Sequence, residues 1–312
     1  MGPGILIIVF KGIGDVILTT PLLRALKKGI PDSRLYFLTR RPSRKILENN
    51  PRLSGVFCRE DKPLSAIRRA GIDISFDFMR STSSGFYSLF SGAKKRLAFH
   101  YSAGHIFYNL MPVKREDNGY TVFDRLQLLE PLGIPADGPQ PELSFAPANA
   151  ARAGAFLDSL PPAPLTVTFD ITSPRDHRRW PAEHFVRLAD NLKTAYGARV
   201  IFLWGPGERE YVKAALASAS EKHPLCPDFD LLDLAALLKR TNLHVGTSSG
   251  PMHVAVSQST PTFTIYAPEN SPANWTPPGP LHSWAQGELS VLPFETVWEL
   301  LRAHLLSLGA VK

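Results

Sequence analysis

The chain has 312 residues, of which 44% are hydrophobic and 20% are charged, as is typical of a globular protein large enough for two domains. No apolar run reaches the roughly 18–20 residues that a membrane-spanning helix needs. Residues 1–150 hold 21 Lys and Arg against 13 Asp and Glu, whereas residues 151–312 hold 14 against 15. Unless this charge only keeps the protein soluble, we expect an anionic partner for the first half. Nucleic acid, an anionic membrane surface or a phosphorylated glycolipid would each fit.

The first predicted unit is a strand, a loop and a helix. Residues 5–10 form a continuous apolar run, as expected for a central strand of a parallel sheet, and residues 11–15 form the loop after it. A helix is predicted over residues 16–28, with a kink at Pro21. Asp15 thus follows the first strand, at the edge where α/β sheets place their ligands, although capping the helix would be a simpler role for it.

The glycines of this loop partly match a dinucleotide-binding fingerprint. Gly12 and Gly14 have the spacing of that fingerprint, but Ile17 stands where its third glycine belongs. The next predicted strand, residues 35–38, leads into Arg40 and offers no acidic residue for a ribose. Both departures argue against a nicotinamide cofactor.

Basic residues follow other predicted strands of the first half. Arg40 opens a basic cluster over residues 40–45, and a strand predicted over residues 73–79 ends in a polar loop that begins with Arg80. Lys94 opens a second basic run, for which a solvated strand edge is the simpler explanation.

The end of the first half is less regular. A helix is predicted over residues 118–132, and residues 101–111 receive no assignment. Residues 139–164 are rich in proline around an alanine-rich helical stretch and form the best candidate for a linker. We place the two domains at residues 1–150 and 151–312.

The second half opens another series of strands, loops and helices. A strand over residues 165–169 leads into a polar loop containing Ser173 and Arg178, and a strand over residues 199–204 leads into a loop that ends at Glu208. Further helices are predicted over residues 231–239 and, as an amphipathic helix, over residues 295–308.

Residues 243–266 combine a strand, a small-residue turn, a helix and a second strand. The free N–H groups and the dipole at a helix N-terminus attract anions. Ser248 and Ser249 add hydroxyl donors, Gly250 allows a ligand to approach the backbone, and Pro251 suits the first helical turn. Phosphate is the expected ligand, and a nucleotide-sugar diphosphate would fit. The alternative is an ordinary capped turn that binds nothing.

Three motifs together resemble the ADP-heptose:lipopolysaccharide heptosyltransferases, glycosyltransferase family 9. They are GIGDVILTTPLLRALKK over residues 12–28, RRWPAEHF over residues 178–185 and GTSSGPMHVAVSQSTPTFTIYAP over residues 246–268. The resemblance implies an α/β protein of the GT-B fold, with two Rossmann-like domains whose parallel sheets face an interdomain cleft. The first domain would bind the acceptor and the second the nucleotide sugar, and the final helix would return to the first domain.

The resemblance also implies an activity, which is inverting transfer of a heptose or a related sugar from an ADP-sugar to a lipopolysaccharide-core acceptor, without metal or cofactor. Asp15 would be the catalytic base, and Arg178, with Arg179 beside it, would neutralise the donor diphosphate. As ordinary surface residues, Arg178 would oppose a helix dipole and Glu208 would complement one. The implied donor contacts are Ser173, Arg178, Glu208, Ser248, Ser249, Gly250 and His253; the implied acceptor contacts are Gly12, Gly14, Arg40, Arg80 and Lys94.

The implied partners are an ADP-sugar, an anionic glycolipid and, as a peripheral contact, an anionic membrane, but not nucleic acid. The implied location is the cytoplasm, at the inner face of the cytoplasmic membrane. There the basic first half would contribute about 1 kcal/mol of attraction per basic residue near the surface.

One departure from the family leaves an alternative open. The family usually has Asp where this chain has Ser248, so the protein would use another nucleotide sugar, bind its donor weakly, or act as a catalytically impaired module that binds a nucleotide sugar or glycolipid. Residues 246–250 also match the nucleophile elbow of serine hydrolases, with no HGGG-type oxyanion loop upstream. The formally available triad partners of Ser248 are Glu269 or Glu288 with His282 or His304.

No metal site is predicted. Cys58 and Cys226 have neither metal-binding nor redox spacing, and no His and Cys cluster has metal spacing. Residues 228–230 read Asp-Phe-Asp, like the metal motif of another glycosyltransferase fold, but they fall in a predicted loop outside that context, and we interpret them as solvated charge.

Overall fold

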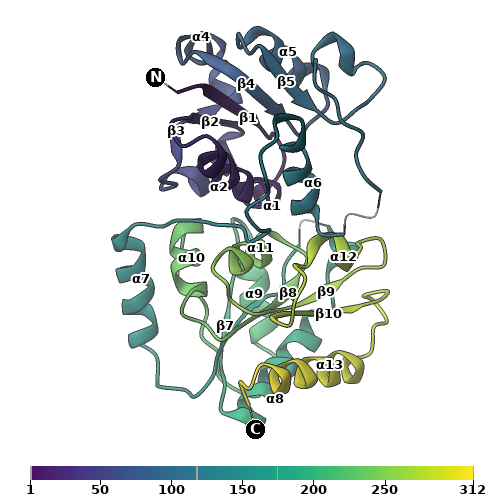
Figure 1. Cartoon of the computed structure of the whole chain (residues 1–312). Helices are drawn as coiled ribbons and strands as arrows, with labels where there is room; N and C mark the ends of the chain where they lie inside the picture. Colours follow the sequence, from purple (N-terminus) through teal and green to yellow (C-terminus); the bar gives the residue numbers. More distant parts are fainter. Residues whose placement is uncertain (1, 117–118, 174, 312) are drawn as a thin grey trace. The chain divides into compact units, whose positions relative to one another are not determined.

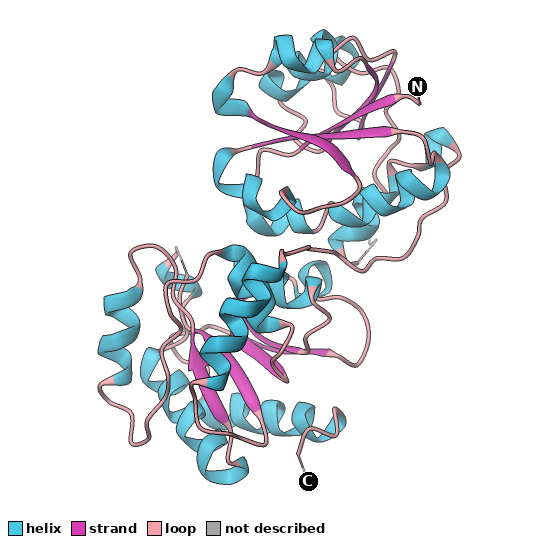
Figure 2. Ribbon diagram, turned by 90° about the vertical axis from the view of Figure 1, so that its left-hand side faces the viewer, coloured by secondary structure: helices cyan, strands magenta, loops and turns pink. Residues whose placement is uncertain are grey.

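The computed structural model describes residues 2–116, 119–173 and 175–311 and contains two five-stranded sheets (Figure 1). The chain divides into two compact units, Met1–Ser144 and Phe145–Lys312. All strand pairs within the two sheets are parallel. Figure 2 shows helices on both faces of each sheet, which is the arrangement of a doubly wound α/β unit.

The sheet of the first unit has the strand order β3-β2-β1-β4-β5. From β1 the chain winds outward through β2 to β3, and then β4 pairs with the other side of β1. The loops after β1 and β4 therefore diverge at a topological switch point, where such sheets bind ligands. The strands are β1 (Gly4–Ile8), β2 (Arg34–Thr39), β3 (Leu53–Cys58), β4 (Ile72–Asp77) and β5 (Lys95–Ala98).

The helix predicted over residues 16–28 is two helices, because Pro21 fits the first turn of a helix better than its interior. These are α1 (Ile13–Ile17) and α2 (Thr20–Gly29). Asn118, the predicted start of the helix over residues 118–132, lies outside the described residues. The other helices of this unit are α3 (Arg41–Arg44), α4 (Leu64–Arg69), α5 (Thr82–Phe90) and α6 (Thr121–Gln127).

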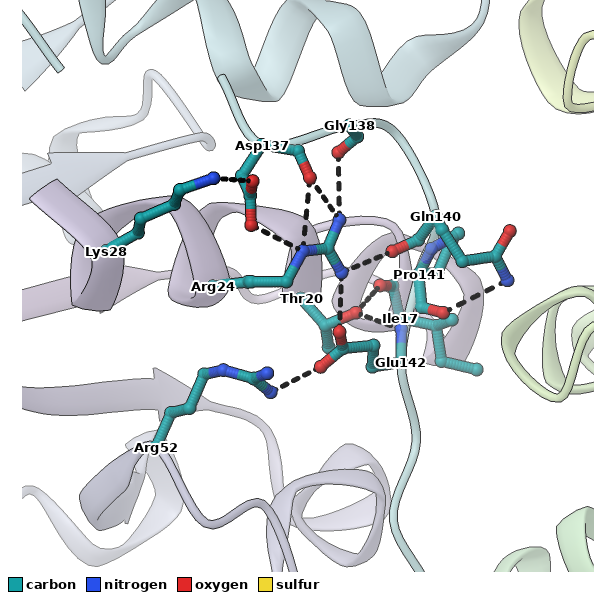
Figure 3. Close-up of polar contacts among 10 residues, drawn as sticks. All are labelled: Ile17, Thr20, Arg24, Lys28, Arg52, Asp137, Gly138, Gln140, Pro141 and Glu142. Carbon is teal, nitrogen blue, oxygen red and sulfur yellow. Dashed lines mark hydrogen bonds and ion pairs between the residues drawn. The ribbon is translucent and has the colours of Figure 1, made fainter. Parts of the chain in front are cut away.

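Arg24 on α2 holds the last segment of the first unit (Figure 3). Its guanidinium donates to the backbone oxygens of Asp137, at 2.7 and 3.1 Å, and of Gly138 and Gln140, both at 3.0 Å. It also pairs with the carboxylates of Asp137 and Glu142. All three nitrogens of the planar guanidinium thus donate hydrogen bonds to this backbone segment.

The same segment is hydrogen-bonded to the end of α1. The backbone N–H of Glu142 donates to Thr20 Oγ1 at 2.8 Å, and the Thr20 hydroxyl donates to the carbonyl of Ile17 at 2.7 Å. Because Ile17 ends the helix that carries Asp15, the segment leading to the second unit is fastened to that helix.

The sheet of the second unit has the strand order β10-β9-β8-β6-β7, with a switch point between β6 and β8. Its apolar core includes Phe169, Trp180 and Phe185, all fully buried. The strands are β6 (Thr166–Asp170), β7 (Arg199–Phe202), β8 (Leu243–Thr247), β9 (Thr262–Tyr266) and β10 (His282–Gln286). The helices are α7 (Pro147–Asp158), α8 (Ala182–Tyr196), α9 (Arg209–Leu216), α10 (Leu231–Leu238), α11 (Gly250–Ser257), α12 (Pro272–Trp275) and α13 (Phe294–Ser307).

The C-terminal helix α13 is amphipathic, as the sequence predicts. Its buried face, which includes Val297, Leu301 and Leu305, belongs to the core of the second unit. There α13 packs on β10 and α8.

Candidate functional site

Asp15 lies in the first turn of α1, just beyond the carboxyl end of β1. Gly12 is the N-cap of this helix, and no side chain caps it, so Asp15 does not have the capping role considered from the sequence. Asp15 Oδ1 accepts a hydrogen bond from Arg125 Nη2 at 2.8 Å and lies 3.8 Å from Lys11 Nζ. Arg125 therefore orients the Asp15 carboxylate, and this side chain is still 20% exposed to solvent.

Arg125 is a functional candidate that the sequence analysis missed. It comes from α6, its side chain is 7% exposed, and its guanidinium lies 4.9 Å from the centre of the Phe78 ring. Burial lowers the pKa of Arg125, and the negative charge of Asp15 opposes that shift. Its position three residues after the buried Val122 is the signal in the sequence, because it puts a charge on the apolar face of the helix.

Asp77 ends β4, on the other side of the same switch point, and is fully buried. It accepts hydrogen bonds from the Tyr108 hydroxyl and, at 2.7 Å, from the backbone N–H of Met79. Burial raises the pKa of Asp77. The backbone N–H of Arg80 also donates to this carboxyl, and Arg80 has a φ of +53°. Since a left-handed backbone costs a non-glycine residue about 1 kcal/mol, Asp77 stabilises a strained turn that carries Arg80.

Arg40 follows β2 at the same edge of the sheet, because the carboxyl ends of parallel strands meet there. It lines a surface cavity together with Arg59, Glu60, Lys62 and Tyr87. Arg40 Nε lies 3.7 Å from Glu60 Oε1. Three cations and one carboxylate make this cavity a candidate anion site.

The other predicted acceptor residues divide into two groups. Gly12 and Gly14 lie with Asp15, and no atom lies within 4 Å of the position that a Gly12 Cβ would take, so no neighbour requires glycine there. Lys94 lies elsewhere, because its N–H donates to Asp73 O at the beginning of β4. The structure thus places Lys94 at the amino edge of the sheet, opposite Asp15, and does not bring it into this site.

In the second unit, Ser249 is the N-cap of α11 and Gly250 is its first residue. The Ser249 hydroxyl donates to Asp170 Oδ2, so the backbone rather than this hydroxyl faces a ligand. A Cβ at Gly246 would lie 2.7 Å from the Asp170 carbonyl, so the strand before the turn requires glycine. The turn predicted to bind an anion thus precedes a helix N-terminus, and the Ser249 hydroxyl is already donated to Asp170.

Asp170 is a functional candidate of the second unit that the sequence analysis missed. It ends β6 and is fully buried, and burial raises its pKa to about 6. The Thr172 hydroxyl lies 2.9 Å from Asp170 Oδ1 and 2.8 Å from Glu208 Oε2. A hydroxyl has one proton, so it donates to only one of the two carboxyls. A proton on Asp170 completes the chain from Asp170 through Thr172 to Glu208.

Glu208 is held from two sides. Its Oε2 accepts from Thr172 and, at 2.9 Å, from the backbone N–H of Gly205. These bonds orient the carboxylate of Glu208 at the carboxyl edge of the sheet, after β7, and leave its Oε1 for a ligand hydroxyl.

Arg178 and Arg179 have different partners. Arg178 Nε pairs with Glu269 Oε1 at 3.0 Å, and Arg179 Nε donates to the Ser173 carbonyl at 2.7 Å. Arg178 follows β6 and Glu269 follows β9, and β8 lies between these strands. The Arg178–Glu269 pair therefore spans the loop that contains Ser248.

Ser248 and His253 lie beside buried aromatic residues. The Ser248 hydroxyl contacts the hydroxyl of Tyr266, whose pKa burial raises to about 12. His253 packs against Trp275, and burial lowers its pKa to about 4. Among the described residues His253 Nδ1 has no hydrogen-bond partner, so the neutral ring has a buried polar atom to satisfy.

The serine hydrolase alternative is wrong on topology. His282 is the first residue of β10, and its Nδ1 is paired with Thr262, the first residue of β9, at 2.9 Å. His304 is close enough to His282 to lower its pKa. Both histidines thus lie at the amino edge of the sheet, whereas Ser248 follows the carboxyl end of β8.

The Asp-Phe-Asp segment has a structural role. Asp230 is the N-cap of α10 and accepts hydrogen bonds from the N–H groups of Leu232 and Asp233. Within the described ranges, no three His, Cys, Asp or Glu side chains are grouped so that they could hold a metal ion. No helix in the described part of the chain is long and apolar enough to cross a membrane.

Two doubly wound α/β units, one with a carboxylate and the other with a helix N-terminus at the switch point of its sheet, are the arrangement expected of a glycosyltransferase of the GT-B fold. The family model described as glycosyltransferase family 9 (heptosyltransferase) matches residues 64–287. The chain belongs to this family, as the resemblance of its motifs predicts.

Known proteins agree with this assignment. Lipopolysaccharide heptosyltransferase 3 of Escherichia coli is 24% identical over 278 residues, which cover 81% of this chain and 80% of the relative. A solved glycosyltransferase family 9 structure from Veillonella parvula has a TM-score of 0.87 at 23% identity and covers 97% of both chains. The E. coli heptosyltransferase WaaC with ADP has a TM-score of 0.77 at 21% identity, with 96% of this chain and 99% of that chain covered. The predicted fold class is confirmed.

Proposed function

We propose that the protein transfers a heptose from ADP-heptose to a lipopolysaccharide-core acceptor in one inverting displacement. The observation that carries the proposal is the Asp15–Arg125 pair at the switch point of the first sheet. A carboxylate that is oriented by a buried guanidinium and still exposed is suited to remove a proton from a hydroxyl group. The names of the relatives, which are lipopolysaccharide heptosyltransferases, support the same reaction.

The acceptor would bind along the carboxyl edge of the first sheet. Arg40 and Arg80 follow two of its strands, and the cavity beside Arg40 is lined by further cations, Arg59 and Lys62. Core lipopolysaccharide carries anionic groups, which such cations attract. The open space beside Gly12 would let a sugar ring approach the backbone next to Asp15.

The donor would bind at the switch point of the second sheet. The Gly250 N–H and the N-terminus of α11 would receive the diphosphate, and Arg178 would exchange its partner Glu269 for a phosphate oxygen. Glu208 would accept hydroxyls of the ribose. These groups would stabilise the negative charge that develops on the leaving ADP.

Ser173 and His253 would complete the donor contacts, and His253 Nδ1 supplies a polar atom without a partner among the described residues. Ser248 stands where the family usually has Asp and would give the donor a hydroxyl in place of a carboxylate. Nothing in the geometry of the described residues favours the alternative of an impaired binding module, because Asp15 is present and fixed in place.

We also propose that the protein works in the cytoplasm at the inner face of the cytoplasmic membrane. The support is the net positive charge of the first unit, which contains 21 basic and 13 acidic residues. The partners would then be the ADP-sugar, the anionic glycolipid acceptor and the anionic membrane surface.

The test is transfer by the purified protein from ADP-heptose to heptose-deficient lipopolysaccharide, measured as release of ADP, with calorimetric titration of ADP, ADP-heptose, UDP-glucose and GDP-mannose. We expect selective binding of the ADP ligands and transfer by the wild type. Asp15→Ala should abolish transfer and leave ADP-heptose binding nearly unchanged. Preference for another nucleotide would refute the proposed donor, and loss of donor binding in Asp15→Ala would show that Asp15 is structural.

A further inference from the structure

Helix α5 and its neighbours carry an exposed apolar and basic surface at the amino edge of the first sheet. Phe86 is 46% exposed and Phe90 is 44% exposed, and they lie one turn apart on α5 with ring centres 4.5 Å from each other. Adjacent exposed rings form a continuous apolar patch, and such a patch among polar residues is typical of a contact with a membrane or another protein.

Four cations lie on the segments next to α5, and we call these cations and the two rings the aromatic-basic face. Arg68 and Arg69 end α4, which packs beside α5. Ile67 of α4 and Ala93 belong to one apolar cluster, and Tyr87 of α5 packs against it, so the segments that carry the cations meet at this cluster. The aromatic-basic face consists of Arg68, Arg69, Phe86, Phe90, Lys94 and Lys95.

The cations of this face have no acidic partner among the described residues. All four are exposed, and none of them forms an ion pair with another described residue. Residues 78–115 contain six Lys and Arg and no Asp or Glu. An uncompensated basic surface of this kind attracts an anionic surface, and exposed aromatic rings among the cations suit the boundary between lipid headgroups and acyl chains.

We propose that the aromatic-basic face docks on a bilayer that contains anionic lipids, with Phe86 and Phe90 inserted among the headgroups. This proposal rests on the membrane contact proposed above and identifies the surface that makes this contact. It also gives Lys94 a role, which is a headgroup contact at the edge of the sheet away from Asp15.

The position of the face is compatible with catalysis at the other edge. Helix α5 begins beside Arg80 at the carboxyl edge and ends with Phe90 at the amino edge. Nine helical residues span about 13 Å, so lipid bound at Phe90 leaves the edge with Asp15 open to a sugar that projects from the bilayer.

The test is flotation of the full-length protein with vesicles of phosphatidylcholine alone and of phosphatidylcholine with phosphatidylglycerol in equal parts. We expect binding to the anionic vesicles alone, weakened by added salt. Lys94→Gln with Lys95→Gln should lower the partition coefficient about 25-fold, since each cation contributes about fivefold. Phe86→Ser with Phe90→Ser should lower it about tenfold or more.

Matched controls come from the second unit. Lys222→Gln with Lys239→Gln removes the same charge, and Leu300→Ser with Leu306→Ser removes two exposed apolar side chains. Both controls should bind vesicles like the wild type, and all four variants should transfer sugar to a detergent-solubilised acceptor at the wild-type rate. The vesicle result decides the docking face even when the wild type transfers no sugar.

Three results would overturn the proposal. The first is equal binding of the wild type to neutral and anionic vesicles. The second is wild-type partitioning by both aromatic-basic face variants. The third is a molecular mass, measured by sedimentation equilibrium, that falls by half in the Phe86→Ser, Phe90→Ser variant, because the face would then join two copies of the chain.

Discussion

Replacing Asp170 with asparagine should stabilise the second unit at neutral pH and not near pH 4. The buried carboxyl of Asp170 has a pKa of about 6 instead of 3.8 because its ionised form is desolvated. A raised pKa means that the folded state binds the proton more tightly, so the free energy of unfolding falls as pH rises between these two values. Asparagine has the same shape and does not ionise.

The size of the effect follows from the two pKa values. At about 1.4 kcal/mol per pKa unit, a carboxyl with a pKa of about 6 in place of 3.8 destabilises the folded state by about 3 kcal/mol above pH 6. Asp170→Asn removes this cost, so the variant should gain up to about 3 kcal/mol over the wild type at pH 8. Below about pH 4 the gain disappears, because the wild-type carboxyl is then protonated in both states.

The second unit can be followed by itself. All five tryptophans of the chain lie in residues 145–312, so urea unfolding monitored by tryptophan fluorescence reports on this unit. The measurement is the free energy of unfolding of wild type and variant at several pH values between 4 and 8. A difference between them that stays constant over this range would refute the reasoning, because the rearranged hydrogen bonds of asparagine do not titrate.

Asp190 provides a control of opposite sign. Partial burial opposes the shift, but hydrogen bonds from His223 and Ser220 hold the pKa of Asp190 below its ordinary value. Such a carboxylate stabilises the folded state above its unfolded pKa, and this contribution is lost as pH falls through the folded pKa. Asp190→Asn should therefore lose stability relative to the wild type as pH rises.

Three further predictions concern the other contacts described above. Arg125→Leu should lower kcat about 100-fold with little change in ADP-heptose affinity, because Asp15 loses its orienting partner, and Arg125→Lys should recover part of the rate; equal rates for both variants and wild type would exclude a positioning role. Arg24→Ala should speed amide hydrogen exchange over residues 137–142 at least tenfold, and unchanged exchange would mean that other contacts hold this segment. Ser248→Asp should raise the affinity for ADP-heptose about tenfold if the carboxylate of the family contacts the donor, and a calorimetric titration that finds no gain would separate this chain from that pattern.

The central strands were predictable because they are buried on both faces and therefore read as apolar runs. Residues 5–10 and 243–245 are such runs, and they fall on β1 and β8. The strands that the sequence analysis missed, β3 and β10, are the outermost strands on one side of each sheet. Edge strands are half-exposed, as the mixed burial of β3 and β10 shows, and such strands lack a continuous apolar pattern.

The candidate site residues that directly follow a strand could be predicted from the sequence. Asp15, Glu208 and Gly250 each follow a predicted strand, so strand ends were sufficient to find them. Their partners were not, because Arg125 is 110 residues from Asp15 and Asp170 is 79 residues from Ser249 in the sequence. Contacts over such distances depend on how the strands are ordered in the sheet, and no local pattern encodes that order.

The buried Asp170 places a carboxyl beside the loop that we propose for the donor diphosphate. Burial raises the pKa of Asp170 to about 6, so the carboxyl is partly protonated near neutral pH, and its oxygens accept from the Ser249 hydroxyl and the Thr172 backbone N–H. Those two bonds connect Ser249, the N-cap of α11, with the loop after β6, where the Thr172 hydroxyl contacts Glu208. Bringing a phosphate to Ser249 should raise the proton affinity of Asp170 further, because a nearby negative charge favours the neutral carboxyl. The buried Asp170 thus lowers the stability of the folded protein, but its hydrogen bonds fix Ser249 in place before the proposed donor binds.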